Sequence, residues 1–356
     1  MSKEDIVKHY KIDTQRMLDR VMSLPEQVED AWALAGEFDF EPSGNDGPVI
    51  ICGMGGSGIG GRLLIDLMGQ EGTKPVVLES SYTLPAFADE NTPVICVSYS
   101  GNTEEVLSCF SHAMIKGCPT AVVTSGGKLE EEAGSSGVPV LKIPGGMPPR
   151  AAIAYLFVPL VRLFSRWGFY EIGDDDVDQA VRKLRKLVNR YSLEGDPSEN
   201  LAMELAKKLY GKIPIIYAGN GLLNSIAYRW KCQFNENSKV MAFSNVFPEL
   251  GHNEVMGWDC PERLREDMFI IVLNDVEDHP RVQKRMEITY GMLSTLGAGG
   301  ISIKSEGEGG REGRLARLFS MLVLGDFVSV YLAVSYGKDP TPIEKISRIK
   351  DELGSM

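Results

Sequence analysis

Val49–Leu64 reads VIICGMGGSGIGGRLL, and this stretch decides the class of fold. The apolar run from Val49 to Cys52 is typical of a buried strand, and a helical pattern begins after the glycines. Glycines let the backbone take positive φ and approach a ligand closely, and a helix N-terminus just beyond offers free N–H groups at the positive end of its dipole. The stretch therefore predicts a strand, a turn and a helix, with an anion bound at the turn.

Short apolar strand patterns alternate with helical patterns along the rest of the chain. Those before residue 190 are PVVLES, PVICVSYS, PTAVVTS and VPVLKI, and a second pass begins with KIPIIYAGNGLLNSIAYRW after the polar stretch RYSLEGDPSENL. Such alternation indicates parallel sheets covered by helices on both faces. We expect a duplicated α/β fold of two doubly wound parallel-sheet domains, residues 36–190 and 191–340, with an N-terminal helical segment 1–35 and a C-terminal helix 341–356.

The composition is that of a soluble globular protein. The chain has 356 residues, 43% of them apolar and 24% charged, and its net charge of -12 argues against a nucleic-acid partner. The N-terminus has no apolar core of a signal peptide, and no stretch reaches the roughly 18 apolar residues of a membrane span. Six cysteines without a CxxC pair favour buried, reduced thiols over metal ligands. We expect a cytoplasmic protein with no membrane contact and no bound metal.

A second motif, SYSGNTEE, begins at Ser98 and follows another apolar strand. Its hydroxyls, on Ser98, Ser100 and Thr103, can surround a phosphate together with backbone amides and without any lysine. Thr103 also fits an ordinary helix N-cap, which would explain one or two of these residues. Three hydroxyls beside a second glycine-containing turn are better explained by a ligand.

The glycine-rich turn allows a different interpretation as a nucleotide site. Gly53, Gly55 and Gly58 fit the dinucleotide fingerprint G-x-G-x-x-G, and Glu79 at the end of PVVLES could be its acidic companion. This alternative predicts an oxidoreductase that requires a nicotinamide cofactor.

GMGGSGIGG followed by SYSGNTEE resembles the sugar isomerase domain, and KCQFNENSKVMAFSNVFPELGHNEVMGW is similar to the bifunctional phosphoglucose/phosphomannose isomerases. The resemblance covers essentially the whole chain. It implies a homodimeric enzyme of glycolysis and gluconeogenesis that interconverts glucose 6-phosphate, and mannose 6-phosphate, with fructose 6-phosphate through a cis-enediol. It also implies that no redox cofactor is needed. The substrate phosphate would be bound by Gly56, Ser57, Ser98, Ser100 and Thr103.

The same resemblance supplies the catalytic candidates. Glu236 in FNENSK matches the family's base, although the residues alone fit a solvated glutamate at a helix end equally well. His252 in PELGHNEV matches the histidine that opens the sugar ring, which in this family reaches the site from the neighbouring subunit. Arg150 stands at a helix start, where a cation opposes the helix dipole, so stabilisation of an enediolate explains it better than a surface charge does.

The C-terminal helix and the loop before it hold the remaining candidates. Lys350 matches in approximate place the family's C-terminal lysine, and Lys345 is its rival. Thr341 could be the hydroxyl that permits either configuration at C2. A non-catalytic phosphosugar sensor stays open as a separate class of function, although such regulators usually carry a basic DNA-binding module, which is not evident in this acidic chain.

Overall fold

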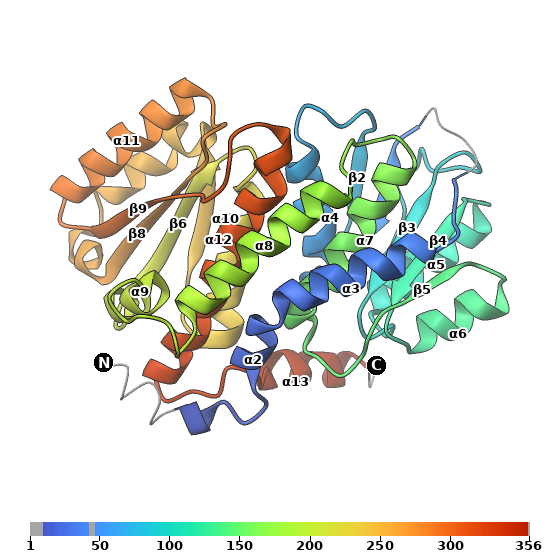
Figure 1. Cartoon of the computed structure of the whole chain (residues 1–356), viewed down its shortest axis with the longest axis horizontal. Coiled ribbons are helices and arrows are strands. Elements are labelled where there is room, and N and C mark those ends of the chain that lie inside the picture. Colours follow the sequence, from blue (N-terminus) through green and yellow to red (C-terminus); the bar gives the residue numbers. More distant parts are fainter. Residues whose placement is uncertain (1–9, 43–46, 355–356) are drawn as a thin grey trace. The chain divides into compact units, whose positions relative to one another are not determined.

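The computed structural model describes residues 10–42 and 47–354, which form two compact units (Figure 1). One unit comprises Ser23–Leu184 and Gly307–Leu318; the other comprises Arg185–Glu306 with the described residues up to Met22 and from Phe319 onward. Each unit contains one parallel sheet, which confirms the predicted α/β class. The domain limits near residues 35, 190 and 340 stay a prediction, and residues 1–9 and 355–356 of the expected terminal helices lie outside the described residues.

The sheet of the first unit has the order β2-β1-β3-β4-β5, and all its pairs are parallel. Its strands are β1 Val49–Cys52, β2 Val76–Glu79, β3 Val94–Ser98, β4 Thr120–Thr124 and β5 Val140–Lys142. The chain order reverses between β1 and β3, and open sheets of this kind bind ligands at the carboxyl ends of the strands beside such a switch point. Cys52 of β1 lies opposite Cys96 of β3 in the register of the sheet, so the turns that follow these two strands lie side by side.

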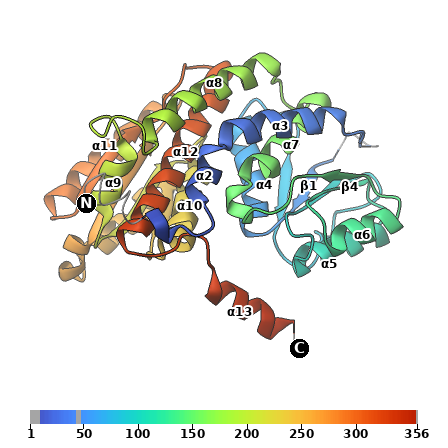
Figure 2. The ribbon, with the colours of Figure 1, turned by 60° about the horizontal axis from the view of Figure 1, so that its bottom comes forward.

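Helices cover both faces of this sheet (Figure 2). On one face lie α4 Gly55–Met68, α7 Ile153–Arg166 and α3 Leu24–Glu37; on the other lie α5 Glu104–Ile115 and α6 Lys128–Ser135. Alternate strand residues explain the two layers, because Ile50 and Cys52 pack with α5 while Ile51 meets Gly61 of α4. The first helical stretch of the chain therefore includes α3, which packs on α7 in this unit.

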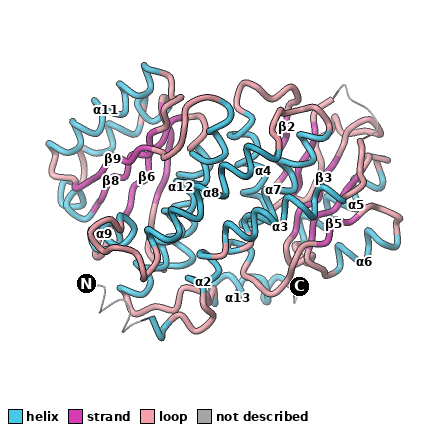
Figure 3. Tube along the Cα trace, viewed as in Figure 1, coloured by secondary structure: helices cyan, strands magenta, loops and turns pink. Residues whose placement is uncertain are grey.

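The sheet of the second unit has the order β7-β6-β8-β9 and is also parallel. Figure 3 shows β6, β8 and β9 of this sheet in magenta. Its strands are β6 Ile213–Gly219, β7 Phe243–Phe247, β8 Met268–Asn274 and β9 Gly299–Lys304. Helix α11, Pro280–Thr295, packs on one face through Met286 and Leu293. Helix α10, Asn224–Gln233, lies on the opposite face with the later part of α12, Arg311–Ser335 (Figure 1).

Helix α12 departs from the expectation that no stretch would resemble a membrane span. By length and composition it could cross a membrane, yet 94% of its apolar window is buried inside the protein. The core helix of a soluble protein passes the same test. Contacts inside the protein cover α12: the indole N–H of Trp230 in α10 donates to the carbonyl of Met321 in α12. The apolar window of α12 is thus part of the buried interior of the protein.

The remaining elements are the long helix α8 and a set of shorter helices and turns. They are η1 Tyr10–Ile12, α2 Met17–Met22, η2 Pro149–Ala151, α8 Asp174–Tyr191, α9 Leu201–Leu209, η3 Phe234–Ser238, η4 Glu249–His252, η5 Glu254–Trp258, η6 Glu262–Asp267 and α13 Glu344–Leu353. All six cysteines are free; four are buried, Cys232 is half-buried and Cys260 is exposed.

Candidate active site

The turn after β1 brings the N-terminus of α4 against the loop that carries Arg150. A Cβ added to Gly56 would lie 3.1 Å from the Arg150 backbone nitrogen, so only glycine permits this approach without a shift. Ser57 follows in the first turn of α4 and is buried. The free amides of this helix start therefore lie beside a guanidinium-bearing residue that is only 3% exposed.

The turn after β3 holds the other predicted hydroxyls. The Ser98 hydroxyl donates to the Thr103 hydroxyl at 3.0 Å, and the Ser100 hydroxyl accepts from the backbone N–H of Asn102 at 3.3 Å. Thr103 is the N-cap of α5, as the alternative interpretation expected, but its side chain makes no capping hydrogen bond. The hydroxyl is thus not used in the way that an ordinary N-cap uses it.

Tyr99 connects these two turns with the loop before Arg150. Its amide donates to the Ser57 hydroxyl at 3.0 Å, while its phenol contacts the Pro144 carbonyl and the Met147 amide, each at 3.0 Å. Sequence reasoning missed this residue, although it stands inside the SYSGNTEE motif. The unit that contains the first sheet therefore gathers all five predicted phosphate-binding residues and Arg150 at one edge of the sheet.

Glu236 lies in η3, a π-helical turn that continues α10. Such turns often occur at functional sites. Its neighbours are fixed by α12, because the Asn237 amide donates to the Ser329 hydroxyl and the Ser238 hydroxyl donates to the Ser329 carbonyl. These two neighbours are buried while Glu236 is half-buried, so the carboxylate is carried on an anchored backbone.

A buried ion pair holds the helix that leads to this turn. Arg229 and Asp326 are 2.7 Å apart with side chains 3% and 6% exposed, and the Gln233 amide donates to the second oxygen of Asp326. Removing one partner of such a pair costs about 3–5 kcal/mol because a buried charge is left alone. The network fixes the register of α10 against α12.

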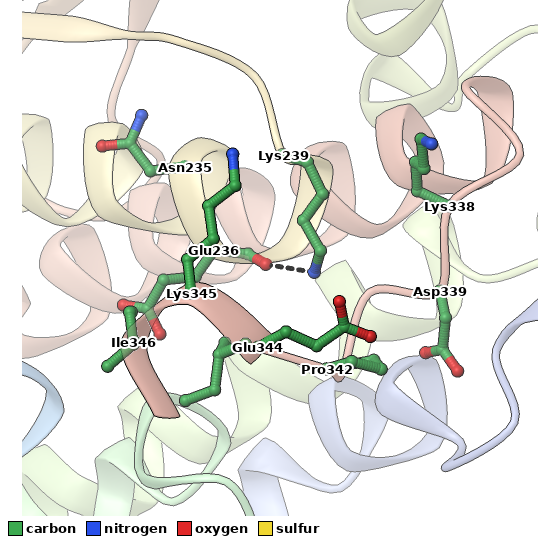
Figure 4. A pocket seen from close by; sticks show the side chains of 10 residues that line it. Asn235, Glu236, Lys239, Lys338, Asp339, Pro342, Glu344, Lys345 and Ile346 are labelled. Carbon is green, nitrogen blue, oxygen red and sulfur yellow. Dashed lines mark hydrogen bonds between the residues drawn. The ribbon is translucent and has the colours of Figure 1, made fainter. Parts of the chain in front are cut away.

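A pocket of about 770 Å³ opens beside Glu236 (Figure 4). Its lining comes from the π turn and from the segment before and at the start of α13: Asn235, Glu236, Lys239, Lys338, Asp339, Pro342, Ile343, Glu344, Lys345 and Ile346. This volume is in the range that holds small ligands. Of the two candidate lysines, Lys345 lines the pocket and Lys350 does not. Thr341 is buried next to the lining residue Pro342.

His252 ends η4 and is exposed, and it is not among the residues that line this pocket. Glu254, two residues on, anchors the loop: it accepts from the Tyr217 hydroxyl at 2.6 Å and also accepts from the Asn245 amide. Burial, together with this carboxylate, raises the pKa of Tyr217 well above its ordinary value. The loop that carries His252 is thus fixed to β6 and β7 while the histidine faces solvent.

The carboxyl edge of the second sheet differs from that of the first. A Cβ on Gly219 would lie 2.3 Å from an oxygen of Asp278, so a carboxylate occupies the place beside the turn. Burial raises the pKa of Asp278 from 3.8 to about 6, and the buried Asp275 lies beside it. Two carboxylates disfavour a phosphate there, so the two sheets do not offer equivalent anion sites.

No cluster in the described part of the chain has the makings of a metal centre. Among residues 10–42 and 47–354, no three or more His, Cys, Asp or Glu side chains are grouped so that they could hold a metal ion.

Comparison with known proteins gives relatives over the whole length. The family model "Bacterial phospho-glucose isomerase C-terminal SIS domain" matches residues 198–353. The bifunctional phosphoglucose/phosphomannose isomerase of Caldicellulosiruptor bescii is 42% identical over 341 residues, covering 96% of this chain and 99% of that protein. Proteins with the same name from Aquifex aeolicus and Thermoplasma acidophilum are 38% and 37% identical, covering 86% and 92% of this chain and 90% and 97% of their own lengths.

Solved structures share the fold at low sequence identity. A hypothetical protein of Thermus thermophilus is similar with a TM-score of 0.75 and 14% identity, covering 99% of this chain and 93% of that one. The C-terminal domain of glucosamine-fructose-6-phosphate aminotransferase from Francisella tularensis gives a TM-score of 0.65 and 15% identity, covering 92% and 98%. These likenesses concern the fold alone.

Proposed function

The chain belongs to the family of bifunctional phosphoglucose/phosphomannose isomerases, and we propose that it interconverts glucose 6-phosphate and mannose 6-phosphate with fructose 6-phosphate. The observation that carries the proposal is the setting of Glu236. Its carboxylate stands on a π turn whose flanking residues are fixed to α12, and it lines a pocket of ligand size. An aldose–ketose isomerase needs such a positioned base to move a proton between C1 and C2.

In this proposal the phosphate group is bound by the turns after β1 and β3. The α4 amides at Gly56 and the hydroxyls of Ser57, Ser98, Ser100 and Thr103 act as donors, and the positive end of the helix dipole favours the dianion. Binding at this remote end orients the carbon chain, which converts binding free energy into correct positioning of C1 and C2.

The proton transfer itself requires a base and a cation. Glu236 takes the proton from C2 of the aldose and returns it to C1, while the hydroxyl proton of O2 passes to O1, with a cis-enediol as the intermediate. Arg150, whose guanidinium carries a permanent charge, stabilises the negative oxygen that develops during this transfer. No change of net oxidation state occurs in the substrate, so the reaction consumes no electron carrier.

Ring opening is assigned to His252 together with a lysine of α13. As the family implies, His252 would come from the second subunit of a homodimer, which agrees with its exposed position outside the Glu236 pocket. Lys350 is the lysine that the resemblance implies, and Lys345 is the one that lines the pocket. Kinetics of Lys345→Met and Lys350→Met on the cyclic substrate distinguish the two lysines, because only replacement of the lysine that takes part in ring opening should lower kcat. We propose that the Thr341 hydroxyl lets the site accept either configuration at C2. We also propose that the protein acts in the cytoplasm.

The deciding experiment is a coupled assay on the purified protein. The isomerisation is run without added metal or nucleotide, the protein is removed, and the fructose 6-phosphate formed from each aldose phosphate is then measured in the coupled step; we expect turnover of both. Binding of the phosphosugars without turnover would favour a sensor instead. Turnover that requires NAD or NADP would favour the oxidoreductase interpretation of Gly53, Gly55 and Gly58.

A further inference from the structure

Lys239 has an unusual backbone conformation directly after the π turn. Its φ is +60°, in the left-handed region that residues other than glycine seldom occupy. Strained residues of this kind persist where the surroundings determine them, and they cluster at functional sites. The conformation turns the Lys239 side chain back toward the turn that carries Glu236 (Figure 4).

The ammonium group of Lys239 bonds to two backbone carbonyls. Nζ donates to the Glu236 carbonyl at 2.5 Å and to the Pro340 carbonyl at 3.0 Å. The Glu236 carbonyl belongs to the π turn, while Pro340 lies in the segment 338–346 that supplies most of the remaining pocket lining. One cation therefore joins the two walls of a single pocket, and hydrogen bonds from a charged donor are the stronger kind.

We propose that Lys239 is a positioning residue that fixes the Glu236 carboxylate relative to the 338–346 wall and thereby sets the ratio of glucose 6-phosphate to mannose 6-phosphate formed from fructose 6-phosphate. This inference rests on the proposed isomerase function. The enediol is planar at C2, and the face that receives the proton decides which aldose is made. Since the base stands on one wall, the distance and angle between the walls decide which face of C2 it meets.

Three substitutions separate the ammonium group from the backbone strain. Lys239→Met keeps the length of the side chain without its charge, Lys239→Gly also relieves the left-handed strain, and Lys239→Arg keeps a charged donor. We expect the Met and Gly variants to change the initial-rate ratio of the two aldose phosphates by about threefold or more, with kcat about tenfold lower and KM nearly unchanged. The Arg variant should keep the wild-type ratio.

A matched control is available in the same unit. Lys212 also donates from Nζ to a backbone carbonyl, that of Glu266, and does not line the pocket. Lys212→Met should therefore leave the product ratio unchanged. The ratio does not depend on the fraction of folded enzyme, and Lys239→Gly removes the ammonium from a position where glycine is the preferred residue.

The proposal is overturned if both Lys239→Met and Lys239→Gly keep the wild-type product ratio, even if their kcat is lower. It is equally overturned if Lys212→Met changes the ratio as much as they do. Failure of the proposed function is a separate result, because in that case the wild-type protein itself would form neither aldose phosphate.

Discussion

The backbone amide of Tyr99 donates a hydrogen bond to the Ser57 hydroxyl over an N–O distance of 3.0 Å, although 42 positions separate the two residues. This bond joins the two glycine-containing turns that sequence reasoning treated as separate motifs. The phenol of the same tyrosine contacts Pro144 and Met147 in the loop before Arg150. One residue thus fixes the proposed phosphate site relative to the proposed enediolate-stabilising cation.

Tyr99→Phe should lower kcat by about tenfold, because the loop before Arg150 loses the hydroxyl that fixes it. Leaving the Pro144 carbonyl and the Met147 amide without that partner should also cost about 1–3 kcal/mol of unfolding free energy. Steady-state kinetics and thermal unfolding measure the two effects. Tyr155→Phe is the control, since it removes a hydroxyl that donates to Asp30 in the same unit and should leave kcat unchanged. Equal losses of kcat in both variants would contradict the role given to Tyr99.

Glu236→Gln should lower the isomerisation rate by about 10²–10⁴-fold, the usual contribution of a general base, while leaving phosphate affinity nearly intact. Exchange of the C2 proton with deuterated water, followed by NMR, reports the step directly, and calorimetry with inorganic phosphate reports the binding. Glu344→Gln is the matched control, because Glu344 is a second carboxylate in the same pocket. If the Glu344 variant loses proton exchange and the Glu236 variant keeps it, the assignment of the base is wrong.

Mixing the inactive variants Glu236→Gln and His252→Ala should restore activity if each site takes its glutamate from one subunit and its histidine from the other. A hybrid dimer then contains one intact site, so random exchange of subunits gives about a quarter of the wild-type activity. Activity is measured after subunit exchange, with each variant incubated alone as the control. A mixture that stays inactive would show that both residues act within one subunit.

Asp278 should make the protein less stable as the pH rises from about 4 to 7. Burial raises its pKa from 3.8 to about 6 in the folded protein, so the folded state binds the proton more tightly than the unfolded state does. The resulting stabilisation is complete below pH 4 and is lost as the pH passes through 6. Because one pKa unit corresponds to about 1.4 kcal/mol, the loss is at most about 3 kcal/mol.

Asp278→Asn should abolish this dependence, which chemical unfolding at pH 4.5 and 7 measures. Asp89→Asn is the control with the opposite sign, because hydrogen bonds from the Asn91 amide and the Thr92 hydroxyl lower the pKa of Asp89 in the folded protein. The assignment would be refuted if the unfolding free energy of the wild-type protein rose between pH 4.5 and 7 by the same amount as that of Asp278→Asn.

Periodic patterns and the glycine turns sufficed to predict both parallel sheets and to place each group of phosphate-binding candidates directly after a strand. Val49–Cys52 and Val94–Ser98 form neighbouring strands, and the carboxyl ends of neighbouring parallel strands meet at one edge. Ser57 and Thr103 therefore follow neighbouring strands, although the sequence did not show that these two strands are neighbours. Local patterns predict each strand and the turn after it, whereas the order β2-β1-β3, which brings the two turns together, comes from the structure.

The supports of Glu236 could not be found in this way. Gln233 meets Asp326 across 93 positions, and Lys239 meets Pro340 across 101. Such contacts depend on how α10 packs on α12, and no local pattern in FNENSK indicates them. The choice between Lys345 and Lys350 was open for the same reason, because helical spacing does not say which residues of α13 meet the pocket.

The π turn at Phe234–Ser238 fits one more residue into its hydrogen-bonded ring than an α-helical turn does, and a regular helix is the more favourable backbone. Shortening FNENS by one residue would let the α geometry continue, yet it would rotate the carboxylate by about 100° around the axis. Variants in which this deletion restores a regular α-helix should accordingly be more stable but inactive, so that a single extra residue sets a trade-off between stability and turnover.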